Sequence, residues 1–289
     1  MTIAVTGATG QLGRLVVDHL LERGVPASRI RALGRSADRL ASLASLGVET
    51  AVIDFERPET LLRAFEGADE LLLVSGSEVG NRIPQHRNAI EAAVAAGVGR
   101  IVYTSAPHAT DTDLVLAPEH AETERLLAAS GLPVTILRNN WYTENYVGQL
   151  DTAAATGEVV SSTGDGRVAS ASRKDYAEAA AVVLTTPGHE GAVYELAGDA
   201  AWTFADLADA LSALVGRPVV HRSVTPEEHA EILRGAGLDE ATVGFVVALD
   251  GNIREGALAD TDGTLSRLLG RPTTPLADGL AEARDRAAA

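Results

Sequence analysis

The chain of 289 residues contains no cysteine. Disulfide bonds, zinc–cysteine sites, iron–sulfur clusters and thiol nucleophiles are therefore excluded. Positive charge is also scarce, with 24 lysine and arginine residues against 40 aspartate and glutamate residues and a formal net charge of −16. Because binding to a phosphate backbone needs a basic surface, we expect no nucleic-acid partner.

Long apolar segments are missing as well. A membrane-spanning helix needs about 18 or more consecutive apolar residues, and the chain has no such run. The first residues, MTIAVTGATG, lack the basic region and apolar stretch of a signal peptide. We therefore expect a soluble cytoplasmic protein that does not bind membranes. The spacing of a metal site, such as His-x-x-x-His or clustered carboxylates, is absent too, and no metal is expected.

Short apolar runs alternate with segments of helical periodicity in the first half of the chain. The expected strands are Thr2–Thr6, Ile30–Leu33, Val48–Ile53, Glu70–Val74, Arg100–Tyr103 and Val134–Leu137. The expected helices are Leu12–Leu21, Leu40–Leu46, Thr60–Phe65, Ala89–Ala96 and Glu119–Ala129. This alternation predicts an α/β fold, a doubly wound parallel (Rossmann) sheet covered by helices on both faces.

The pattern changes after about residue 140. Further helices are expected at Thr152–Thr156 and Tyr176–Leu184, after the caps Thr203 and Thr225, and from Thr274–Pro275 onward. Ala192–Leu196 has the pattern of one more strand that returns to the main sheet. We therefore expect a Rossmann domain at residues 1–140, joined by the strand near 192–197. Residues 141–289 should form a smaller, mostly helical lobe that binds the substrate.

The first expected strand runs directly into a glycine-rich turn, Gly7-Ala8-Thr9-Gly10-Gln11-Leu12-Gly13. In such a turn the first glycine permits a tight bend, the second lets the backbone approach a pyrophosphate, and the third allows close packing. The amides at the start of the following helix then face the phosphates. The turn predicts a dinucleotide site made by Gly7, Thr9, Gly10, Gln11, Leu12 and Gly13. A tight turn without a ligand is the alternative.

The residue at the end of the second strand distinguishes NAD from NADP. NAD enzymes place an acidic residue there, which binds the ribose 2′-hydroxyl. This chain has Arg35 at that position, and a guanidinium suits the 2′-phosphate of NADP. A solvent-exposed arginine without a ligand is the alternative.

Other strand ends supply further candidates for cofactor contacts, because sheets of this kind bind ligands at the carboxyl ends of their strands. These candidates are Asp54 and Phe55 after the third strand, Ser75, Gly76 and Ser77 after the fourth, and Thr104 at the end of the fifth. Each of them is equally well explained as ordinary loop chemistry.

One catalytic pair cannot form in this chain. The glycine loop resembles that of the short-chain dehydrogenases, which usually carry Tyr-x-x-x-Lys. The only lysine is Lys174, and Ser170 lies four residues before it. Two hypotheses follow: the protein binds NADP without catalysis, as a redox sensor, or it reduces a substrate that needs no strong general acid. A quinone is such a substrate, because aromatisation stabilises its product.

Aromatic side chains are few, with 4 Phe, 2 Trp and 5 Tyr, but Trp141, Tyr142 and Tyr146 fall within six residues. Aromatic faces and neighbouring asparagines suit a flat, polar ring, whereas a hydrophobic plug is the alternative. The candidates for a catalytic role are Asn140, Tyr142 and His120, since an imidazole can pass a proton near neutral pH. A surface position on a helix is the alternative for His120, and His86 has similar standing.

Together, these segments resemble the NADPH:quinone oxidoreductase type 2 family, a group of atypical, NmrA-like short-chain reductases. The resemblance rests on Val5–Gly13, Ser77–Gly80, Pro84–Asn88, Glu119–Glu124, Leu137–Asn139 with Trp141 and Tyr142, and Val193–Asp199. It implies an NAD(P)H:quinone oxidoreductase that has a Rossmann domain, uses NADPH as its cofactor and acts on small quinone-like substrates.

The resemblance also carries over a set of cofactor-binding residues. Besides the glycine loop, Arg35 and Ser75–Ser77, this set includes Asn139, Asn140, Trp141, Tyr142, Thr143, Glu144 and Arg173. Triarylmethane-dye reductases are similar over the same segments, so a dye, a natural-product intermediate or another flat electrophile is the alternative substrate. The sequence leaves the oligomeric state open, a homodimer included.

Overall fold

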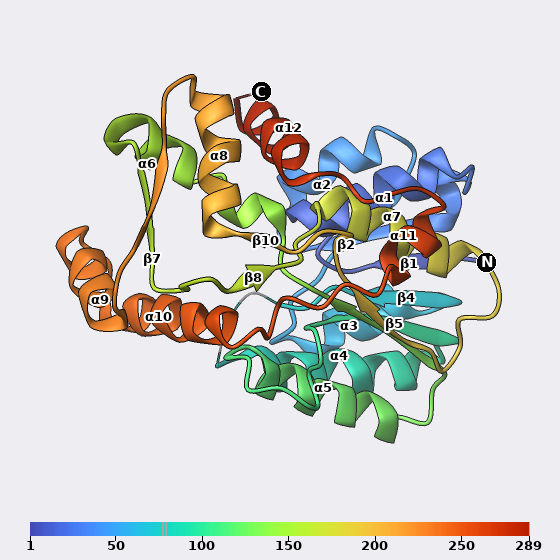
Figure 1. Cartoon of the computed structure of the whole chain (residues 1–289). Coiled ribbons are helices and arrows are strands. Elements are labelled where there is room, and N and C mark those ends of the chain that lie inside the picture. Colours follow the sequence, from blue (N-terminus) through green and yellow to red (C-terminus); the bar gives the residue numbers. More distant parts are fainter. Residues whose placement is uncertain (77, 79, 289) are drawn as a thin grey trace. The chain divides into compact units, whose positions relative to one another are not determined.

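The computed structural model describes residues 1–76, 78 and 80–288 (Figure 1). The chain forms two compact units, which are described separately. The first unit comprises Met1–Thr110, Leu116–Asn139 and Arg173–Leu196. The second comprises Asp111–Val115, Asn140–Ser172 and Ala197–Ala289. Among the helices of the described residues, none combines the length and the apolar character needed to cross a membrane.

The first unit is built on a parallel sheet that has seven strands within the described residues. The strands are β1 (Ile3–Val5), β2 (Ile30–Gly34), β3 (Glu49–Val52), β4 (Glu70–Leu73), β5 (Arg100–Ser105), β6 (Val134–Asn139) and β9 (Val193–Leu196). Their order is β3-β2-β1-β4-β5-β6-β9, and every neighbouring pair is parallel. The doubly wound Rossmann fold predicted from the sequence is therefore confirmed, with β9 beside β6.

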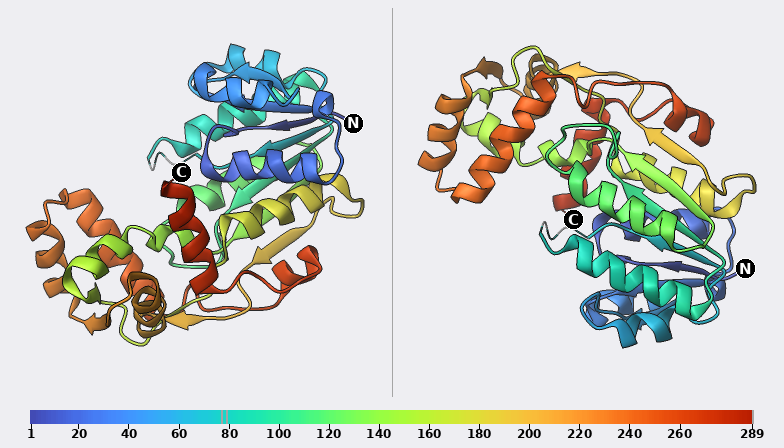
Figure 2. Two further views of the ribbon diagram at one scale, coloured as in Figure 1. Left: turned by 90° about the horizontal axis from the view of Figure 1, so that it is seen from above. Right: turned by 90° about the horizontal axis from the view of Figure 1, so that it is seen from below.

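Helices cover both faces of this sheet, as its continuous apolar strands require. They are α1 (Gln11–Glu22), α2 (Ala37–Ala44), α3 (Pro58–Phe65), α4 (Arg82–Ala96), α5 (Ala117–Ala129) and α7 (Arg173–Thr185), with a short 3₁₀ turn, η1 (Ala27–Arg29). On one face α1 packs beside α7, and on the other α3, α4 and α5 lie in a row (Figure 2). The core between α3–α5 and the sheet includes the fully buried Phe65 and Tyr103.

Two helix boundaries follow from the local sequence, and one differs from expectation. Pro58 occupies the first turn of α3, where no backbone donor is needed, and Gly97 ends α4 with φ +71°. Helix α4 begins at Arg82, seven residues before the expected Ala89. Its first two turns bury Gln85 and His86, so polar side chains occupy positions where the periodicity should show apolar ones.

The second unit combines short strands with helices. Its elements are η2 (Thr143–Tyr146), α6 (Gln149–Thr156), β7 (Glu158–Ser161), β8 (Arg167–Val168), β10 (Trp202–Thr203), α8 (Phe204–Val215), β11 (Val220–Ser223), α9 (Pro226–Gly235), α10 (Glu240–Arg254), α11 (Thr264–Leu269) and α12 (Leu276–Ala288). Strand β10 pairs with β8 in antiparallel and β11 with β7 in parallel orientation. Thr203 and Thr225 cap α8 and α9 as the sequence predicts.

The aromatic residues of the second unit form a cluster. Tyr146 is 7% exposed, and its ring lies 5.0 Å from Trp202 and 5.8 Å from Phe204, both in edge-to-face geometry. Of the three aromatics that the sequence places together, Tyr146 is therefore a core residue, as the hydrophobic-plug alternative holds. Trp141 and Tyr142 are partly exposed.

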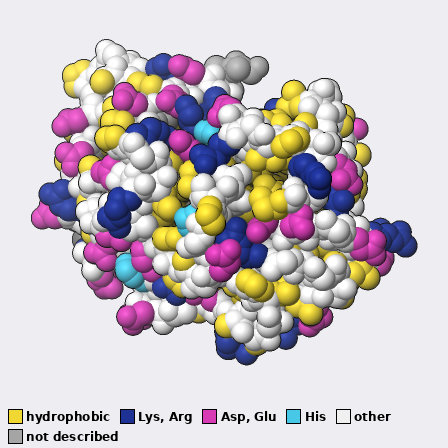
Figure 3. Space-filling model, turned by 90° about the vertical axis from the view of Figure 1, so that its right-hand side faces the viewer, with side chains coloured by type: hydrophobic (Ala, Val, Ile, Leu, Met, Phe, Trp, Pro, Cys, Tyr) yellow, Lys and Arg dark blue, Asp and Glu magenta, His cyan; other side chains and the backbone are white. Residues whose placement is uncertain are grey.

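Charged side chains of both signs are interspersed over the molecular face in Figure 3. Exposed arginines of the first unit lie beside carboxylates, as in the pairs Arg14–Asp18 at 3.1 Å and Arg57–Glu59 at 3.0 Å. Charges of opposite sign therefore lie close together on that face, while the whole chain keeps a formal net charge of −16.

Candidate functional site

The topological switch point of the main sheet lies between β1 and β4. From β1 the sheet extends in one direction to β2 and β3, and in the other to β4 and the strands that follow it. The side chain of Thr6 joins the two strand ends: its Oγ1 donates to the Leu72 carbonyl at 3.2 Å and accepts from the Val74 amide at 2.9 Å. In open α/β sheets, ligands bind outside the carboxyl ends at this point.

The glycine loop leaves β1 at the switch point. Gly7 has φ +61°, and its carbonyl accepts a hydrogen bond from the Gly10 amide at 2.8 Å. A Cβ at Gly13 would lie 2.4 Å from the Gly7 carbonyl oxygen, so no other residue fits there without movement of the backbone. No described side chain caps α1, which leaves its first amides open to an anion. The loop conformation matches the sequence prediction.

A further glycine, which sequence reasoning missed, brings the loop close to β2. A Cβ at Gly34 would lie 2.7 Å from Cγ2 of Thr9, and the Ala8 amide donates to the Leu33 carbonyl at 2.9 Å. The end of β2 is therefore fixed against the glycine loop. The signal in the sequence was a glycine at the last position of a buried strand.

Arg35 follows Gly34 and already pairs with an anionic group of the protein. Its Nη1 lies 2.7 Å from Oε1 of Glu78, whose other oxygen accepts from Gln85 at 3.0 Å. The hydrogen bonds from Gln85 and Arg35 lower the pKa of Glu78. The Arg35 side chain is 73% exposed. It therefore presents a guanidinium at the carboxyl edge, as the sequence predicts. Ser77, another predicted contact, lies outside the described residues.

The loop after β4 is held from two sides. The Ser75 amide donates to Oγ1 of Thr104 at 2.9 Å. The Gly76 amide donates to Nε2 of His86 at 3.0 Å, and the Gly76 carbonyl accepts from Nε of Arg82 at 2.9 Å. The predicted cofactor residues Ser75, Gly76 and Thr104 thus lie together, and α4 fixes the orientation of the peptide groups around Gly76.

The bonds of His86 define its tautomer. Since an amide can only donate, Nε2 of His86 is the acceptor, and Nδ1 carries the proton toward Oγ1 of Thr123 at 3.0 Å. The Thr123 hydroxyl in turn donates to the Glu119 carbonyl at 2.8 Å. Burial, with a smaller contribution from the nearby Arg82, lowers the pKa of His86 to about 3. The ring is therefore neutral at ordinary pH, and its two hydrogen bonds hold it in one orientation.

His120 lies in the same buried region, on α5. Its side chain is 5% exposed, and its Nδ1 lies 2.8 Å from the hydroxyl of the fully buried Tyr103. Burial lowers the pKa of His120 to about 3 and raises the pKa of Tyr103. A ring that stays buried and neutral has only its weakly acidic N–H to offer and no imidazolium proton, which argues against the hypothesis that His120 is a proton donor.

The predicted adenine wall follows β3. Oδ1 of Asp54 accepts from the Glu56 amide at 2.9 Å, which closes a local turn. The Phe55 carbonyl accepts from Nδ2 of Asn88 at 2.8 Å, and the Phe55 ring lies edge-on to His86 with centroids 6.3 Å apart. Phe55 is partly exposed.

The remaining predicted residues are divided between the two units. Asn139 ends β6 and Arg173 begins α7, both in the first unit, whereas Asn140 to Glu144 belong to the second. Within the second unit Nδ2 of Asn140 donates to the Leu258 carbonyl at 3.2 Å. Thr143, 1% exposed, bonds through Oγ1 to Ser170 at 2.8 Å.

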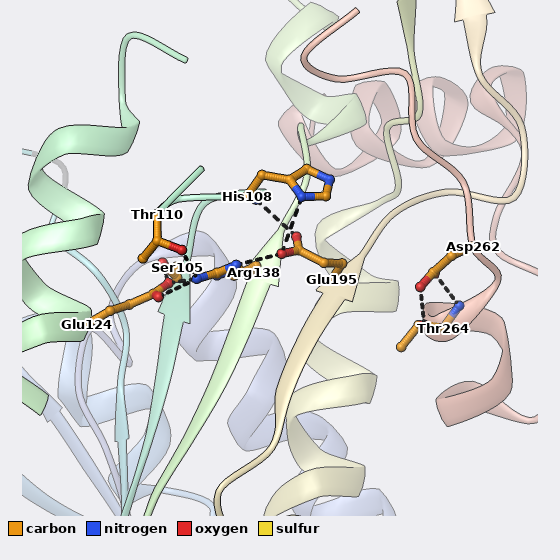
Figure 4. Close-up of polar contacts among 8 residues, drawn as sticks. All are labelled: Ser105, His108, Thr110, Glu124, Arg138, Glu195, Asp262 and Thr264. Atoms are coloured by element: carbon orange, nitrogen blue, oxygen red, sulfur yellow. Dashed lines mark hydrogen bonds and ion pairs between the residues drawn. The ribbon is translucent and has the colours of Figure 1, made fainter. Parts of the chain in front are cut away.

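Three further strand ends of the first unit share a charged cluster, drawn in Figure 4. Nη2 of Arg138 at the end of β6 lies 2.6 Å from Oε2 of Glu124, and its Nη1 lies 2.8 Å from Oε1 of Glu195. Ser105 donates to Glu124 at 2.7 Å. The hydrogen bonding that Arg138 donates to Glu124 is the largest cause of the raised pKa of Arg138. Sequence reasoning did not predict this cluster, because its members are far apart in the chain.

Across residues 1–76, 78 and 80–288, no group of three or more His, Asp or Glu side chains is arranged to hold a metal ion.

The fold, its switch point and the glycine loop define the class of the protein, a dinucleotide-binding Rossmann protein.

The comparisons with known proteins agree with this class. A family model described as NAD(P)H-binding matches residues 7–187. Quinone oxidoreductase 2 of Escherichia coli (strain K12) is 46% identical over 278 residues, which cover 96% of this chain and 97% of the relative.

Two solved structures are similar over nearly the full length. The crystal structure of the E. coli NADPH-dependent quinone oxidoreductase 2 with NADPH has a TM-score of 0.93 at 45% identity and covers 97% of this chain and 99% of its own. Citrobacter sp. triphenylmethane reductase with NADP(H) has a TM-score of 0.92 at 40% identity, covering 98% and 100%. The chain belongs to the quinone oxidoreductase 2 family of NAD(P)H-binding proteins, as its resemblance indicates.

Proposed function

We propose that this protein is an NADPH-dependent reductase that transfers hydride directly to a quinone. The observation that carries the proposal is the combination of the glycine loop with Arg35 directly after β2: Gly7 has φ +61°, and a Cβ at Gly13 would lie 2.4 Å from a backbone oxygen. The first suits a pyrophosphate and the second suits a 2′-phosphate. The name of the E. coli relative and its structure with NADPH support the cofactor and the substrate class.

The residues present fit this cofactor. The amides at the start of α1 would hold the pyrophosphate, Arg35 the 2′-phosphate, and Ser75 and Gly76 would line the site, with the Gly76 peptide already fixed by His86 at 3.0 Å. When bound, the reduced nicotinamide supplies a hydride. The protein supplies position and electrostatics, which is its usual share of the work in cofactor enzymes.

The chain lacks the Tyr–Lys pair of short-chain dehydrogenases, and the proposed reaction does not need it. Lys174, the only lysine, is the second residue of α7, and Ser170 lies four residues before it. Reduction of a quinone yields an aromatic hydroquinone, so the chemistry proceeds without a strongly activated acid. Tyr142 and Asn140 remain our candidates for orienting the flat substrate, because the Tyr142 ring is partly exposed and aromatic faces bind such rings.

Steady-state kinetics tests the proposal. The purified protein is mixed with NADPH and a panel of small benzoquinones and naphthoquinones, and the oxidation of NADPH is followed. We expect turnover with quinones and a preference for NADPH over NADH. Tight binding of NADPH without turnover of any quinone would refute the enzyme and would favour the redox-sensor hypothesis.

One other substrate class has specific support. The triphenylmethane reductase of Citrobacter sp. is 40% identical to this chain and matches its fold with a TM-score of 0.92. A triarylmethane dye is also a flat, electron-poor acceptor of hydride. Kinetics with a dye beside the quinone panel ranks the two classes by kcat/KM.

A further inference from the structure

The carboxyl edge of the first unit holds one histidine that the mechanism above does not use. The chain has seven histidines. His86 and His120 are buried and neutral, with pKa values of about 3. His19 lies in the last turn of α1, and His189 precedes β9, so both lie toward the amino edge of the sheet.

The other histidines differ in place. His221 and His229 belong to the second unit, where His221 bonds Ser161 at 2.9 Å and Nδ1 of His229 lies 2.9 Å from Asp250. His108 lies three residues beyond Ser105, the last residue of β5, with 39% of its side chain exposed. Within the described part of the first unit, it is therefore the histidine at the carboxyl edge with an exposed ring.

The backbone of His108 is strained and held in place. Its φ of +47° is the only left-handed value at a non-glycine residue in the described chain. Such a conformation is unfavourable for a residue with a Cβ and persists where surrounding contacts enforce it. Here the His108 amide donates to Oε2 of Glu195 at 3.1 Å, and Glu195 is fixed by Arg138 at 2.8 Å (Figure 4).

Arg138, which holds Glu195, is itself held by further hydrogen bonds. Arg138 also bonds Glu124 at 2.9 and 2.6 Å and Thr110 at 2.9 Å. The cluster contains two carboxylates for one guanidinium, and Oε1 of Glu195 lies 3.7 Å from Nδ1 of His108. Strained residues held by several contacts are concentrated at functional sites, and the imidazole, with 39% of the side chain exposed, is the titratable ring that this cluster presents to solvent.

We propose that His108 is the proton donor to the reduced substrate and that Glu195 is its positioning residue, an inference that rests on the proposed function. Hydride addition converts the quinone to a hydroquinone monoanion. An N–H bond of the His108 imidazolium then breaks, an O–H bond forms on the hydroquinone oxygen, and the neutral imidazole takes a proton from water. Overall, one hydride and one proton are added to the quinone.

Two substitutions at His108 separate the effect of losing the imidazole from the effect of the strained backbone. His108→Asn keeps a residue that tolerates the left-handed region, and His108→Gly removes the strain. Both lack the imidazole, so we expect kcat with quinone to fall on the order of 100-fold in each, the low end for general acid catalysis. KM for NADPH should stay unchanged, and added imidazole should restore part of the rate of His108→Gly. His189→Asn, at the opposite edge, is the matched control and should keep the full rate.

An equilibrium binding measurement tests His108 without requiring the protein to turn over a quinone. 4-Nitrophenolate mimics the hydroquinone monoanion, and its Kd for the full chain with NADP⁺ is measured by equilibrium dialysis. We expect His108→Asn to weaken this binding on the order of tenfold, since a charge-assisted hydrogen bond is lost, and His189→Asn to leave it unchanged.

The outcomes distinguish the two proposals. A wild-type protein that reduces no quinone refutes the proposed function, and the nitrophenolate arm still tests His108 as an anion-binding donor. A wild-type kcat in both His108 variants, or an equal loss in His189→Asn, would overturn the inference. So would rates in His108→Gly that do not respond to imidazole.

Discussion

The contact between Arg35 and Glu78 makes the choice of cofactor testable. Nη1 of Arg35 lies 2.7 Å from Oε1 of Glu78, while Gln85 holds the second oxygen at 3.0 Å. If Arg35 binds the 2′-phosphate, the phosphate and the Glu78 carboxylate compete for one guanidinium. We therefore predict opposite effects of the two substitutions: Arg35→Ala weakens NADPH binding, whereas Glu78→Gln strengthens it.

The structure sets the size of each effect. The Arg35 and Glu78 side chains are 73% and 38% exposed, so water and salt screen their attraction and the gain from Glu78→Gln is about fivefold at most. Arg35→Ala removes a charge-assisted contact to the phosphate, which corresponds to about 10- to 150-fold in Kd. NADH, without the phosphate, should be nearly indifferent to both changes.

Titration calorimetry with NADPH and NADH on the wild type, both single variants and the double variant checks these values. In the Arg35→Ala background, Glu78→Gln should have no effect, because the competition is gone. The reasoning fails if Arg35→Ala weakens NADH as much as NADPH, or if Glu78→Gln weakens NADPH. High salt should reduce the difference between wild type and Arg35→Ala.

Three further predictions concern the buried frame of the site. Gly13→Ala should abolish measurable NADPH binding, since its Cβ would lie 2.4 Å from a backbone oxygen, whereas Gly244→Ala, with open space around it, should bind normally in the same calorimetric assay. The pKa values of His86 and His120, about 3 in the folded chain, lie below the ordinary 6.5, so the unfolded chain binds more protons between these values. The free energy of unfolding should therefore fall as the pH drops below 6.5, by about 2 kcal/mol per ring at pH 5. Urea unfolding at several pH values measures this, and the same pH dependence in His120→Gln as in the wild type would contradict it. Tyr103→Phe removes the 2.8 Å bond to His120 and should cost about 1–3 kcal/mol in urea unfolding; an unchanged midpoint would show that the bond is not formed.

Much of the fold could be predicted because local rules and tertiary structure agree in the first half of the chain. Apolar runs formed parallel strands, which are largely buried at β1, β2, β4 and β5 but not at the edge strand β3. Gly97 ends α4, and the glycine loop adopted the predicted turn. The prediction of α4 failed over its first two turns because Gln85 and His86 are polar and nevertheless buried. Periodicity cannot reveal a buried polar side chain whose partners, such as the Gly76 amide, are defined only by the fold.

The second unit was harder to predict for a different reason. Strands β8 and β10 have two residues each, too few for an alternating pattern to appear. Helix α10 was not predicted, and it contains Gly244 and Gly251, a residue type that disfavours helix interiors. The charged cluster around Arg138 could not be predicted at all, because Glu124, Arg138 and Glu195 meet only when β5, β6 and β9 lie side by side.

The charged groups at the carboxyl edge of the first unit differ between the two ends of the strand order. At β1 and β2 the groups presented are backbone amides, at the start of α1, and the Arg35 guanidinium, which is matched by one carboxylate, that of Glu78. At β5, β6 and β9 two carboxylates surround one guanidinium, and a pyrophosphate would be repelled there. The same charge difference therefore favours one direction for an anionic dinucleotide, with its phosphates at β1 and β2 and its uncharged reduced ring toward β5. In the proposed binding mode, the orientation of the cofactor follows from the order of strands together with the glycine loop, and reversing the charge at either end should disturb it.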